Sequence, residues 1–298
     1  MLKQRLLSSA VIVPLLFLGL LFLPSAALLV VLISVSTLMI LEFYNALNRA
    51  DIPAFRYVGA GFGVAIILAT YVGFMWKAGD TTAASRLARA TEWETIILAC
   101  AVLALMIRQF PQKHNAKPLP TIACTLFGVL YVPFLMNFFT KLAFVSGNAG
   151  WTTPLANTPG FYLILYVVLA SKLTDAGAFF VGRSFGRHKL FPRLSPGKTW
   201  EGFAGGTVTC ILMSVAFFKY VGSEQLGGLV IPLSHAVALG IILAIAGMAG
   251  DLAESVLKRA SMLKDSGSIV PGIGGMLDMV DSAIFIAPLF YFYIRLMM

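Results

Sequence analysis

Two aspartates near the end of the chain, Asp278 and Asp281, have the spacing of a metal site. They lie three positions apart at the expected start of a helix, so their carboxylates share one helix face. Two negative charges so placed repel each other unless a cation lies between them. Carboxylate oxygens suit Mg²⁺, which completes its coordination shell with water and phosphate oxygens. Helix capping would explain Asp278 alone, but it leaves the second aspartate unexplained.

A glycine-rich turn comes directly before this pair. The stretch SGSIVPGIGGML holds a Pro-Gly pair followed by Gly274 and Gly275, and it cannot form regular helix. Glycines let backbone N–H groups come close to a chain of phosphates. We therefore expect Gly274 and Gly275 to contact a phosphorylated substrate beside the carboxylates.

A third aspartate belongs to the segment GMAGDLAESVLKRASMLKD at 247–265. On a helix, Asp251, Glu254, Ser255 and Lys258 form one polar stripe about 100° wide. A solvated amphipathic extension would give the same stripe. Asp251, however, lies at the expected membrane boundary, where a carboxylate needs a partner. We predict that Asp251 is a further metal ligand.

The segment SPGKTWEG, residues 195–202, predicts a phosphate contact. A Ser-Pro-Gly turn that begins at Ser195 is followed by Lys198 and Thr199, directly before an apolar run. This order aims a lysine, a hydroxyl and backbone N–H groups at one point near a helix N-terminus. GKT resembles the end of a Walker A loop, but no glycine precedes it at the required spacing and no strand is expected here. The sequence therefore excludes a P-loop.

Lys172 and Asp175 fall inside an apolar run and share one helix face. Ionisable residues inside a membrane span are costly and usually face a cavity or a partner. Asp175 is therefore either a further metal ligand or the counter-ion of Lys172. A purely structural ion pair is the alternative.

The composition shows what kind of chain must position these residues. Of 298 residues, 59% are hydrophobic and 12% are charged, and the mean hydropathy is +0.88. Soluble domains have about 25% charged residues, so the chain is predicted to be an all-α, polytopic integral membrane protein. Crossing a bilayer takes about 20 apolar residues in a helix. About nine runs approach that length: 6–23, 25–46, 57–76, 95–108, 119–140, 160–182, 201–220, 228–250 and 280–297.

Basic residues set the expected orientation. With a cytoplasmic N-terminus, most lysines and arginines outside the spans fall on the inner side, including the loops near residues 183–198 and 256–264. Part of the +9 net charge is this bias, so it does not indicate nucleic-acid binding. It suits anionic headgroups and phosphates. The predicted active site faces the cytoplasm.

The unusual polar residues follow about residue 171. We therefore predict an N-terminal scaffold at 1–140 and a catalytic region at 141–298, in which the most informative segment is 255–282. The segment at 77–94 reads as a connector or an amphipathic helix outside the membrane. Cys100, Cys124 and Cys210 show no metal or disulfide pattern, and a packing role is expected for them.

The run SVLKRASMLKDSGSIVPGIGGMLDMVDS, from Ser255 to Ser282, resembles the signature of the phosphatidate cytidylyltransferases, also called CDP-diacylglycerol synthases. The segments TDAGAFFVGRSFG and SPGKTWEG are also similar to that family, and the specific resemblance covers about residues 171–288. Two positions depart from it: Ile273 replaces the signature histidine and Met279 replaces an arginine. Roles of those two side chains in the family are not carried over.

The resemblance implies that phosphatidate and CTP give CDP-diacylglycerol and pyrophosphate, for phospholipid biosynthesis in the cytoplasmic (inner) membrane of a bacterium. It also implies Mg²⁺, a monovalent cation as a second ion, and a homodimer. The expected metal ligands are Asp251, Asp278 and Asp281, with Asp175 and Asp265 as further candidates; Asp265 could instead position Lys264. The expected phosphate and substrate contacts are Ser195, Lys198, Thr199, Ser255, Lys258, Arg259, Lys264, Gly274 and Gly275.

Three other functions remain open at this point. A transporter could bind an anionic substrate at Lys172 and Asp175, although such folds usually show two related halves. A CDP-alcohol phosphotransferase also uses aspartates and metal, but its D-G-x2-A-R segment is missing. A catalytically silent relative that acts as a scaffold is conceivable because of Ile273 and Met279.

Overall fold

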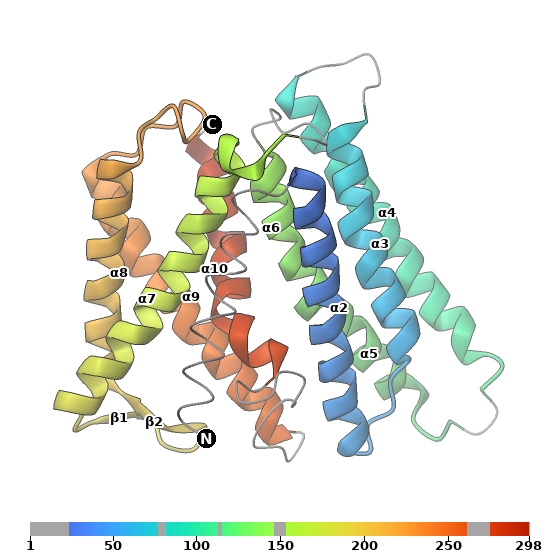
Figure 1. Ribbon diagram of the computed structural model, residues 1–298. Coiled ribbons are helices and arrows are strands. Elements are labelled where there is room, and N and C mark those ends of the chain that lie inside the picture. Colours follow the sequence, from blue (N-terminus) through green and yellow to red (C-terminus); the bar gives the residue numbers. More distant parts are fainter. Residues whose placement is uncertain (1–23, 77–81, 113–114, 146–152, 261–274, 298) are drawn as a thin grey trace. The chain divides into compact units, whose positions relative to one another are not determined.

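The computed structural model describes residues 24–76, 82–112, 115–145, 153–260 and 275–297. This part of the chain is almost entirely helical, with one two-stranded antiparallel sheet (Figure 1). Eight of the described helical segments are long and apolar enough to cross a membrane. The predicted all-α, multi-pass membrane protein is confirmed. The ninth expected span, at 6–23, lies outside the described residues.

The chain divides into two compact units. The first comprises residues 1–158 and 260–279, and the second comprises residues 159–259 and 280–298. The helix α10 (Met276–Met297) begins in the first unit and continues in the second. The predicted division into scaffold and catalytic regions at residue 140 stays a prediction.

The first unit is built from five further α-helices and two short helical turns. They are α2 (Ser25–Arg49), α3 (Arg56–Met75), α4 (Ala83–Gln109), α5 (Pro118–Val129), the π-helical turn η1 (Leu130–Phe134), α6 (Leu135–Phe144) and the 3₁₀ turn η2 (Leu155–Asn157). The segments α5, η1 and α6 form one candidate span, Pro118–Phe144, where the sequence predicts 119–140. Pro133 gives no backbone N–H to the helical ladder, which accounts for the change to π geometry there.

Helix α4 corrects two expectations. The predicted span at 95–108 begins at Ala83 instead, so most of the segment expected to be a connector or a separate helix belongs to α4. A buried ion pair explains the difference, because Lys141 Nζ lies 2.5 Å from Glu94 Oε2. Asn137 Nδ2 donates to Glu94 Oε1 (3.0 Å) and to Thr70 Oγ1 (2.7 Å). A charged residue can stay inside a span when it is paired in this way.

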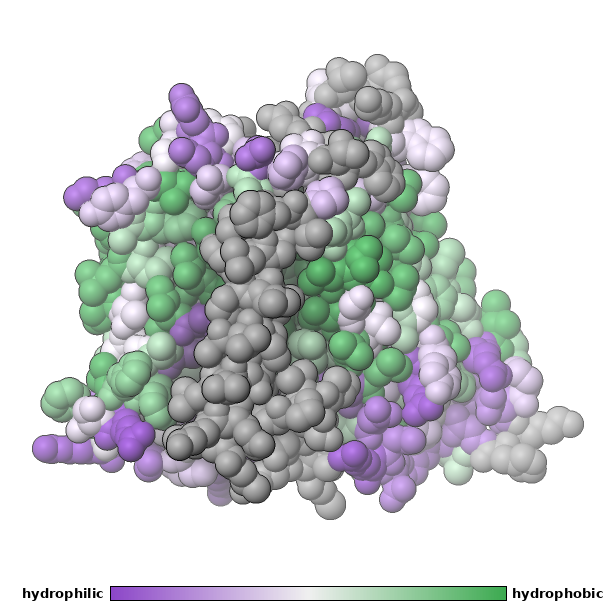
Figure 2. Space-filling view, viewed as in Figure 1, coloured by the Kyte–Doolittle hydropathy of each residue, from purple (hydrophilic) through white to green (hydrophobic). Residues whose placement is uncertain are grey.

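The second unit contains the helix α7 (Pro159–Phe185), a hairpin of β1 (Lys189–Phe191) and β2 (Ser195–Thr199), and the helices α8 (Trp200–Tyr220) and α9 (Leu233–Ala260). Helices α7 and α8 lie side by side (Figure 1), and glycines make their close approach possible. A Cβ atom at Gly202 would lie 2.8 Å from the Ala178 carbonyl oxygen, and one at Gly206 2.9 Å from that of Thr174. Figure 2 shows hydrophobic side chains over the middle of these helices and hydrophilic ones towards their ends.

Aromatic side chains form part of the core of the second unit. The ring of Tyr166 packs against Phe217 and Phe290, with centroids 5.1 and 4.6 Å apart. The Tyr166 hydroxyl is 2.8 Å from Ser214 Oγ, so its polar atom is satisfied inside the core. These contacts hold α7, α8 and α10 together and fix the helices that carry the polar residues described below.

All three cysteines are free thiols, as the sequence predicts. Cys210 is fully buried and packs in the core of the second unit. The packing role predicted for Cys100 is wrong, because its side chain is exposed on α4.

Candidate active site

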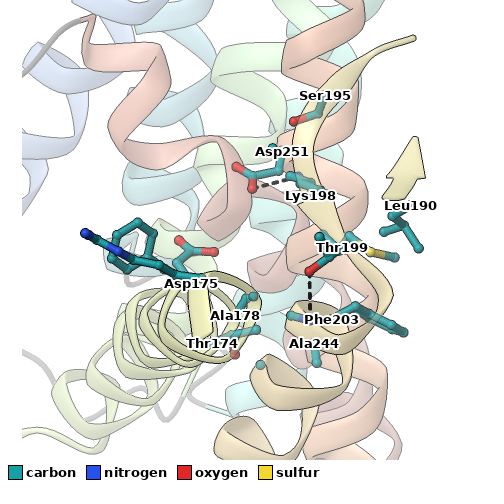
Figure 3. Close-up of a pocket in the computed structure, with 17 residues that line it drawn as sticks. Thr174, Asp175, Ala178, Leu190, Ser195, Lys198, Thr199, Phe203, Ala244 and Asp251 are labelled. Carbon is teal, nitrogen blue, oxygen red and sulfur yellow. Dashed lines mark hydrogen bonds and ion pairs between the residues drawn. The ribbon is translucent and has the colours of Figure 1, made fainter. Parts of the chain in front are cut away.

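A pocket of about 450 Å³ opens in the second unit (Figure 3). Its walls come from α7, α8, α9 and the β hairpin. Asp175, Lys198 and Asp251 supply charges, whereas small apolar residues such as Ala178 and Ala244 line much of the remaining wall. The pocket can therefore take a molecule that has both a charged and an apolar part.

The β hairpin was not expected from the sequence. Lys189 pairs with Thr199 and Phe191 with Ser195 across its two strands. Pro196 and Gly197 disfavour strands, but an edge of a two-stranded sheet tolerates both residue types. The GKT sequence thus lies within strand β2, so the expectation that no strand occurs here is wrong.

Glu201 fixes the path of the chain into this hairpin. Its carboxylate accepts backbone N–H bonds from Arg187 (3.1 Å) and His188 (3.2 Å). The His188 ring Nδ1 lies 2.6 Å from Glu201 Oε1. A residue in the first turn of α8 therefore holds the end of the segment that follows α7. No role was predicted for Glu201, although its place in SPGKTWEG put it at the start of a helix.

Thr199 has a structural partner. Its hydroxyl oxygen accepts the Gly202 N–H at 3.1 Å and caps the N-terminus of α8. The side chain is buried, yet the residue still lines the pocket. Ser195 and Lys198, the two other residues predicted from this segment, also line the pocket.

Lys198 and Asp251 meet in the pocket. The Lys198 Nζ atom lies 2.8 Å from Asp251 Oδ2, and the two side chains are 24% and 33% exposed. Figure 3 shows the Asp175 carboxylate turned towards the same space, and it interacts electrostatically with Asp251. Two sequence segments that predicted phosphate and metal contacts are thus brought together with the intramembrane aspartate.

Ser282 links Asp251 to Asp281. Its hydroxyl donates to Asp251 Oδ1 at 3.3 Å, and its backbone N–H donates to Asp281 Oδ1 at 2.7 Å. Asp281 is only 3% exposed. The acidic group formed by Asp175, Asp251 and Asp281 comes from three helices, and Lys198 compensates one of its charges.

The described residues do not include a complete set of ligands for one metal ion. Within the described ranges, no group of three His, Cys, Asp or Glu side chains is placed so as to hold one ion. Asp278 belongs to the first unit, and Asp281 belongs to the second. The metal site predicted from Asp251, Asp278 and Asp281 therefore stays a prediction.

Glu254 is a further carboxylate that the sequence left without a role. It lies one turn after Asp251 on α9, is 4% exposed, and interacts with Asp281. Lys258, predicted to hold phosphate, lies 3.1 Å from Glu254 Oε1 through its Nζ atom. The polar stripe of this segment was the only signal for Glu254, and its burial depends on packing that the sequence does not show.

Two other predicted contacts from this segment have protein partners. The Ser255 hydroxyl donates to the Asp251 carbonyl oxygen at 2.9 Å, within α9. Arg259 Nε donates to the Leu194 carbonyl oxygen at 2.6 Å. Arg259 thereby joins the end of α9 to the hairpin turn that precedes Ser195, so it can hold the turn as well as a phosphate.

The start of α10 has its own carboxylates. Asp278 Oδ2 accepts the N–H of Gly275 at 3.4 Å, so the capping role that the sequence left open for Asp278 is observed. Glu42 Oε2, from α2, accepts the Leu277 N–H at 2.9 Å. Sequence reasoning missed Glu42, a single carboxylate in an apolar run. Lys264, Asp265 and Gly274 lie outside the described residues.

Comparison with known proteins identifies the family. The model of the cytidylyltransferase family matches residues 3–297. The phosphatidate cytidylyltransferase of Bacillus subtilis is 42% identical over 137 residues, which cover 46% of this chain and 49% of that protein. That of Haemophilus influenzae is 41% identical over 140 residues, covering 45% and 46%. The chloroplastic phosphatidate cytidylyltransferase 4 of Arabidopsis thaliana is 34% identical over 218 residues, covering 67% and 52%.

The chain spans about half the length of these curated relatives in each match. The family model, in contrast, extends over nearly the whole chain, including the scaffold helices that carry no specific motif. The resemblance read from residues 171–288 is confirmed. This chain belongs to the cytidylyltransferase family.

Proposed function

We propose that this protein transfers a cytidylyl group from CTP to phosphatidate and produces CDP-diacylglycerol and pyrophosphate. The pocket of the second unit carries the proposal, because it joins the Lys198–Asp251 ion pair to a largely apolar wall. The names of the relatives support the same substrates. The lipid headgroup and the nucleotide would meet at the charged end, and the acyl chains would lie along the apolar residues.

The reaction asks the protein mainly for alignment and charge neutralisation. A phosphate oxygen of phosphatidate attacks the α-phosphorus of CTP and forms a new P–O bond. The bond from that phosphorus to the oxygen that bridges to the β-phosphate breaks, and pyrophosphate leaves with the electron pair. The attacking oxygen is already an anion, so no general base is needed. Lys198 would stabilise phosphate charge, and Asp251 would hold the lysine in place.

The metal part of the proposal starts from the acidic group of the second unit, although its described carboxylates are not placed to hold one ion together. Asp175, Asp251 and Asp281 interact or share a partner; Lys198 pairs with Asp251, and Lys172 interacts electrostatically with Asp175. These three carboxylates would hold Mg²⁺, which when bound would neutralise charge on the CTP phosphates. Asp278 stays a predicted ligand, as does Asp265. A monovalent second ion is proposed from family resemblance alone.

The cellular setting follows from the same proposal. CTP is a cytoplasmic nucleotide and phosphatidate is a membrane lipid, so the pocket would face the cytoplasm from a bacterial inner membrane. The distribution of basic residues supports a cytoplasmic N-terminus. A homodimer is proposed from the resemblance, and no nucleic-acid partner is expected.

Purified protein in detergent, incubated with phosphatidate, radiolabelled CTP and Mg²⁺, tests the activity. A lipid-soluble CDP product that disappears when a chelator is added would support both the reaction and its metal dependence. A product that still forms with chelator would support the transferase activity and contradict its dependence on metal. If the protein is folded but forms no product, while an active relative does as a positive control, the result would favour a catalytically silent scaffold. The departures at Ile273 and Met279 are the reason for considering that alternative.

A further inference from the structure

Glu42 is a buried carboxylate that none of the steps above uses. It lies in α2, inside a candidate membrane span, and is only 2% exposed. A charge in such a place is costly, so it persists where it has a partner or a task. Its partner is the first turn of α10, because Glu42 Oε2 accepts the Leu277 N–H at 2.9 Å. The two residues are 235 positions apart in the chain.

The residue before α10 provides no side-chain cap for the first turn. Gly275 precedes the helix and has no side chain that could accept a hydrogen bond from the free N–H groups of the first turn. Glu42 accepts one of these N–H groups from outside the helix. Its negative charge also lies at the positive end of the helix dipole, where it is stabilised. Glu42 therefore caps the N-terminus of α10, as Thr199 caps that of α8.

This cap acts on the turn that carries Asp278. Leu277 is the residue directly before Asp278, and the Asp278 carboxylate itself turns back to the Gly275 N–H at 3.4 Å. Glu42 thus accepts an N–H group inside the first turn, and Asp278 accepts that of the residue before the helix. If Leu277 loses its acceptor, the turn can fray, and the direction of the Asp278 side chain is no longer fixed.

We propose that Glu42 is a positioning residue that holds Asp278 in place for cytidylyl transfer. The inference rests on the proposed function and extends the catalytic machinery to a helix of the first unit, which the sequence motifs do not reach. The task of Glu42 in this scheme is to accept one hydrogen bond. It contacts neither the nucleotide nor the lipid.

Three substitutions separate this role from others. Glu42→Gln keeps an oxygen acceptor at the same reach, and its amide nitrogen replaces Oε1, which accepts no hydrogen bond within the described residues. Glu42→Asp keeps the charge but is one methylene too short. Glu42→Leu removes the acceptor. Ser36→Ala is the matched control, because Ser36 is also buried in α2 and its hydroxyl has no described hydrogen-bond partner.

The assay is the CDP-diacylglycerol assay above, with kcat expressed per folded molecule. Glu42→Leu should lower kcat by about 10- to 100-fold, the range caused by small misplacements of catalytic groups. Glu42→Gln should retain at least about a third of wild-type kcat, and Glu42→Asp should fall below Glu42→Gln. Hydrogen exchange at the peptide that contains Leu277 should accelerate in the Asp and Leu variants only.

Other orders of activity would overturn the proposal. Glu42→Gln as inactive as Glu42→Leu would mean that the charge itself is needed, as in a direct metal ligand. Normal kcat per folded molecule in all variants, with a lower thermal midpoint, would mean a purely structural cap. If Glu42→Leu does not fold, the order of the Gln and Asp variants decides. A wild-type protein without any activity would instead contradict the proposed function, while the exchange measurement would still test the cap.

Discussion

The Lys198 ammonium lies 2.8 Å from the Asp251 carboxylate and joins the β hairpin to α9. Both side chains keep part of their surface accessible in the pocket, at 24% and 33%. Lys198 follows a turn that holds Ser195, and Asp251 is linked through Ser282 to Asp281. One ion pair therefore connects the hairpin residues proposed to contact phosphate with the carboxylates proposed to bind metal.

Neutralising this lysine should reduce activity strongly. Lys198→Gln removes the positive charge that would stabilise the phosphates, and losing one such group costs about 10²- to 10³-fold in kcat. Lys189→Gln is the matched control, because Lys189 lies in the paired strand β1 and is exposed. Cytidylyl transfer measured on both purified variants checks the prediction. If the Lys198→Gln and Lys189→Gln variants were equally active, Lys198 would have no role in cytidylyl transfer.

Asp281 should be essential for metal binding. Asp281→Asn keeps an oxygen that can accept the Ser282 N–H, so the local fold should persist. The charge that would hold a divalent cation is lost, and we expect activity to fall by about 100-fold or more. Wild-type protein should show an increased thermal midpoint with added Mg²⁺, because a ligand that binds the folded state stabilises it, whereas the variant should not.

Asp51→Asn provides the control for this pair of measurements. Asp51 has a φ of 54°, and asparagine tolerates that left-handed conformation. The control should keep both the activity and the Mg²⁺-dependent shift. An Asp281→Asn protein that shifts with Mg²⁺ as the wild type does would remove Asp281 from the ligands.

Most of the helices could be predicted from the sequence, because runs of about 20 apolar residues leave few alternatives in a membrane. The start of α4 could not, since Glu94 and Lys141 read as residues outside the membrane until their pairing is known. Local sequence carries no signal for a contact between residues 47 positions apart. Helix boundaries are therefore predicted wrongly where a residue far away in the sequence neutralises a buried charge.

The candidate site shows the same limit. Lys198, Asp251 and Asp281 could be selected from the sequence because their segments have unusual polar patterns. Glu42 and Glu254 could not be given a role. Glu42 is a lone carboxylate in an apolar run, and the Leu277 N–H that it binds lies in another part of the chain. Glu254 is recognised only when its burial and its pairing are seen.

The hydroxyl of Thr199 should matter more for stability than for substrate binding. It caps α8 through the Gly202 N–H, and replacing such a cap with alanine costs about 1 kcal/mol. Thr199→Ala should therefore lower the thermal midpoint in detergent, whereas Thr199→Ser should restore it. A normal midpoint together with a raised KM for CTP in Thr199→Ala would show instead that the hydroxyl contacts the nucleotide.

The buried pair of Glu94 and Lys141 predicts a non-additive effect on stability. Lys141→Met leaves the Glu94 charge buried without its lysine, and breaking such a pair costs about 3–5 kcal/mol. Adding Glu94→Gln removes that charge and keeps an acceptor for Asn137, which donates to Glu94 Oε1 at 3.0 Å. The double variant should therefore be more stable than the single Lys141→Met variant.

Thermal unfolding in one detergent, with the same lipid content, compares the variants. Lys189→Met is the control for loss of a lysine at an exposed position, where changes are usually within about 0.5 kcal/mol. A single variant as stable as the wild type would mean that water or lipid headgroups reach Glu94. A double variant no more stable than Lys141→Met would assign the loss to the packing of the lysine chain. Recovery in the double variant would show that the loss in Lys141→Met comes from leaving the buried Glu94 charge without its lysine.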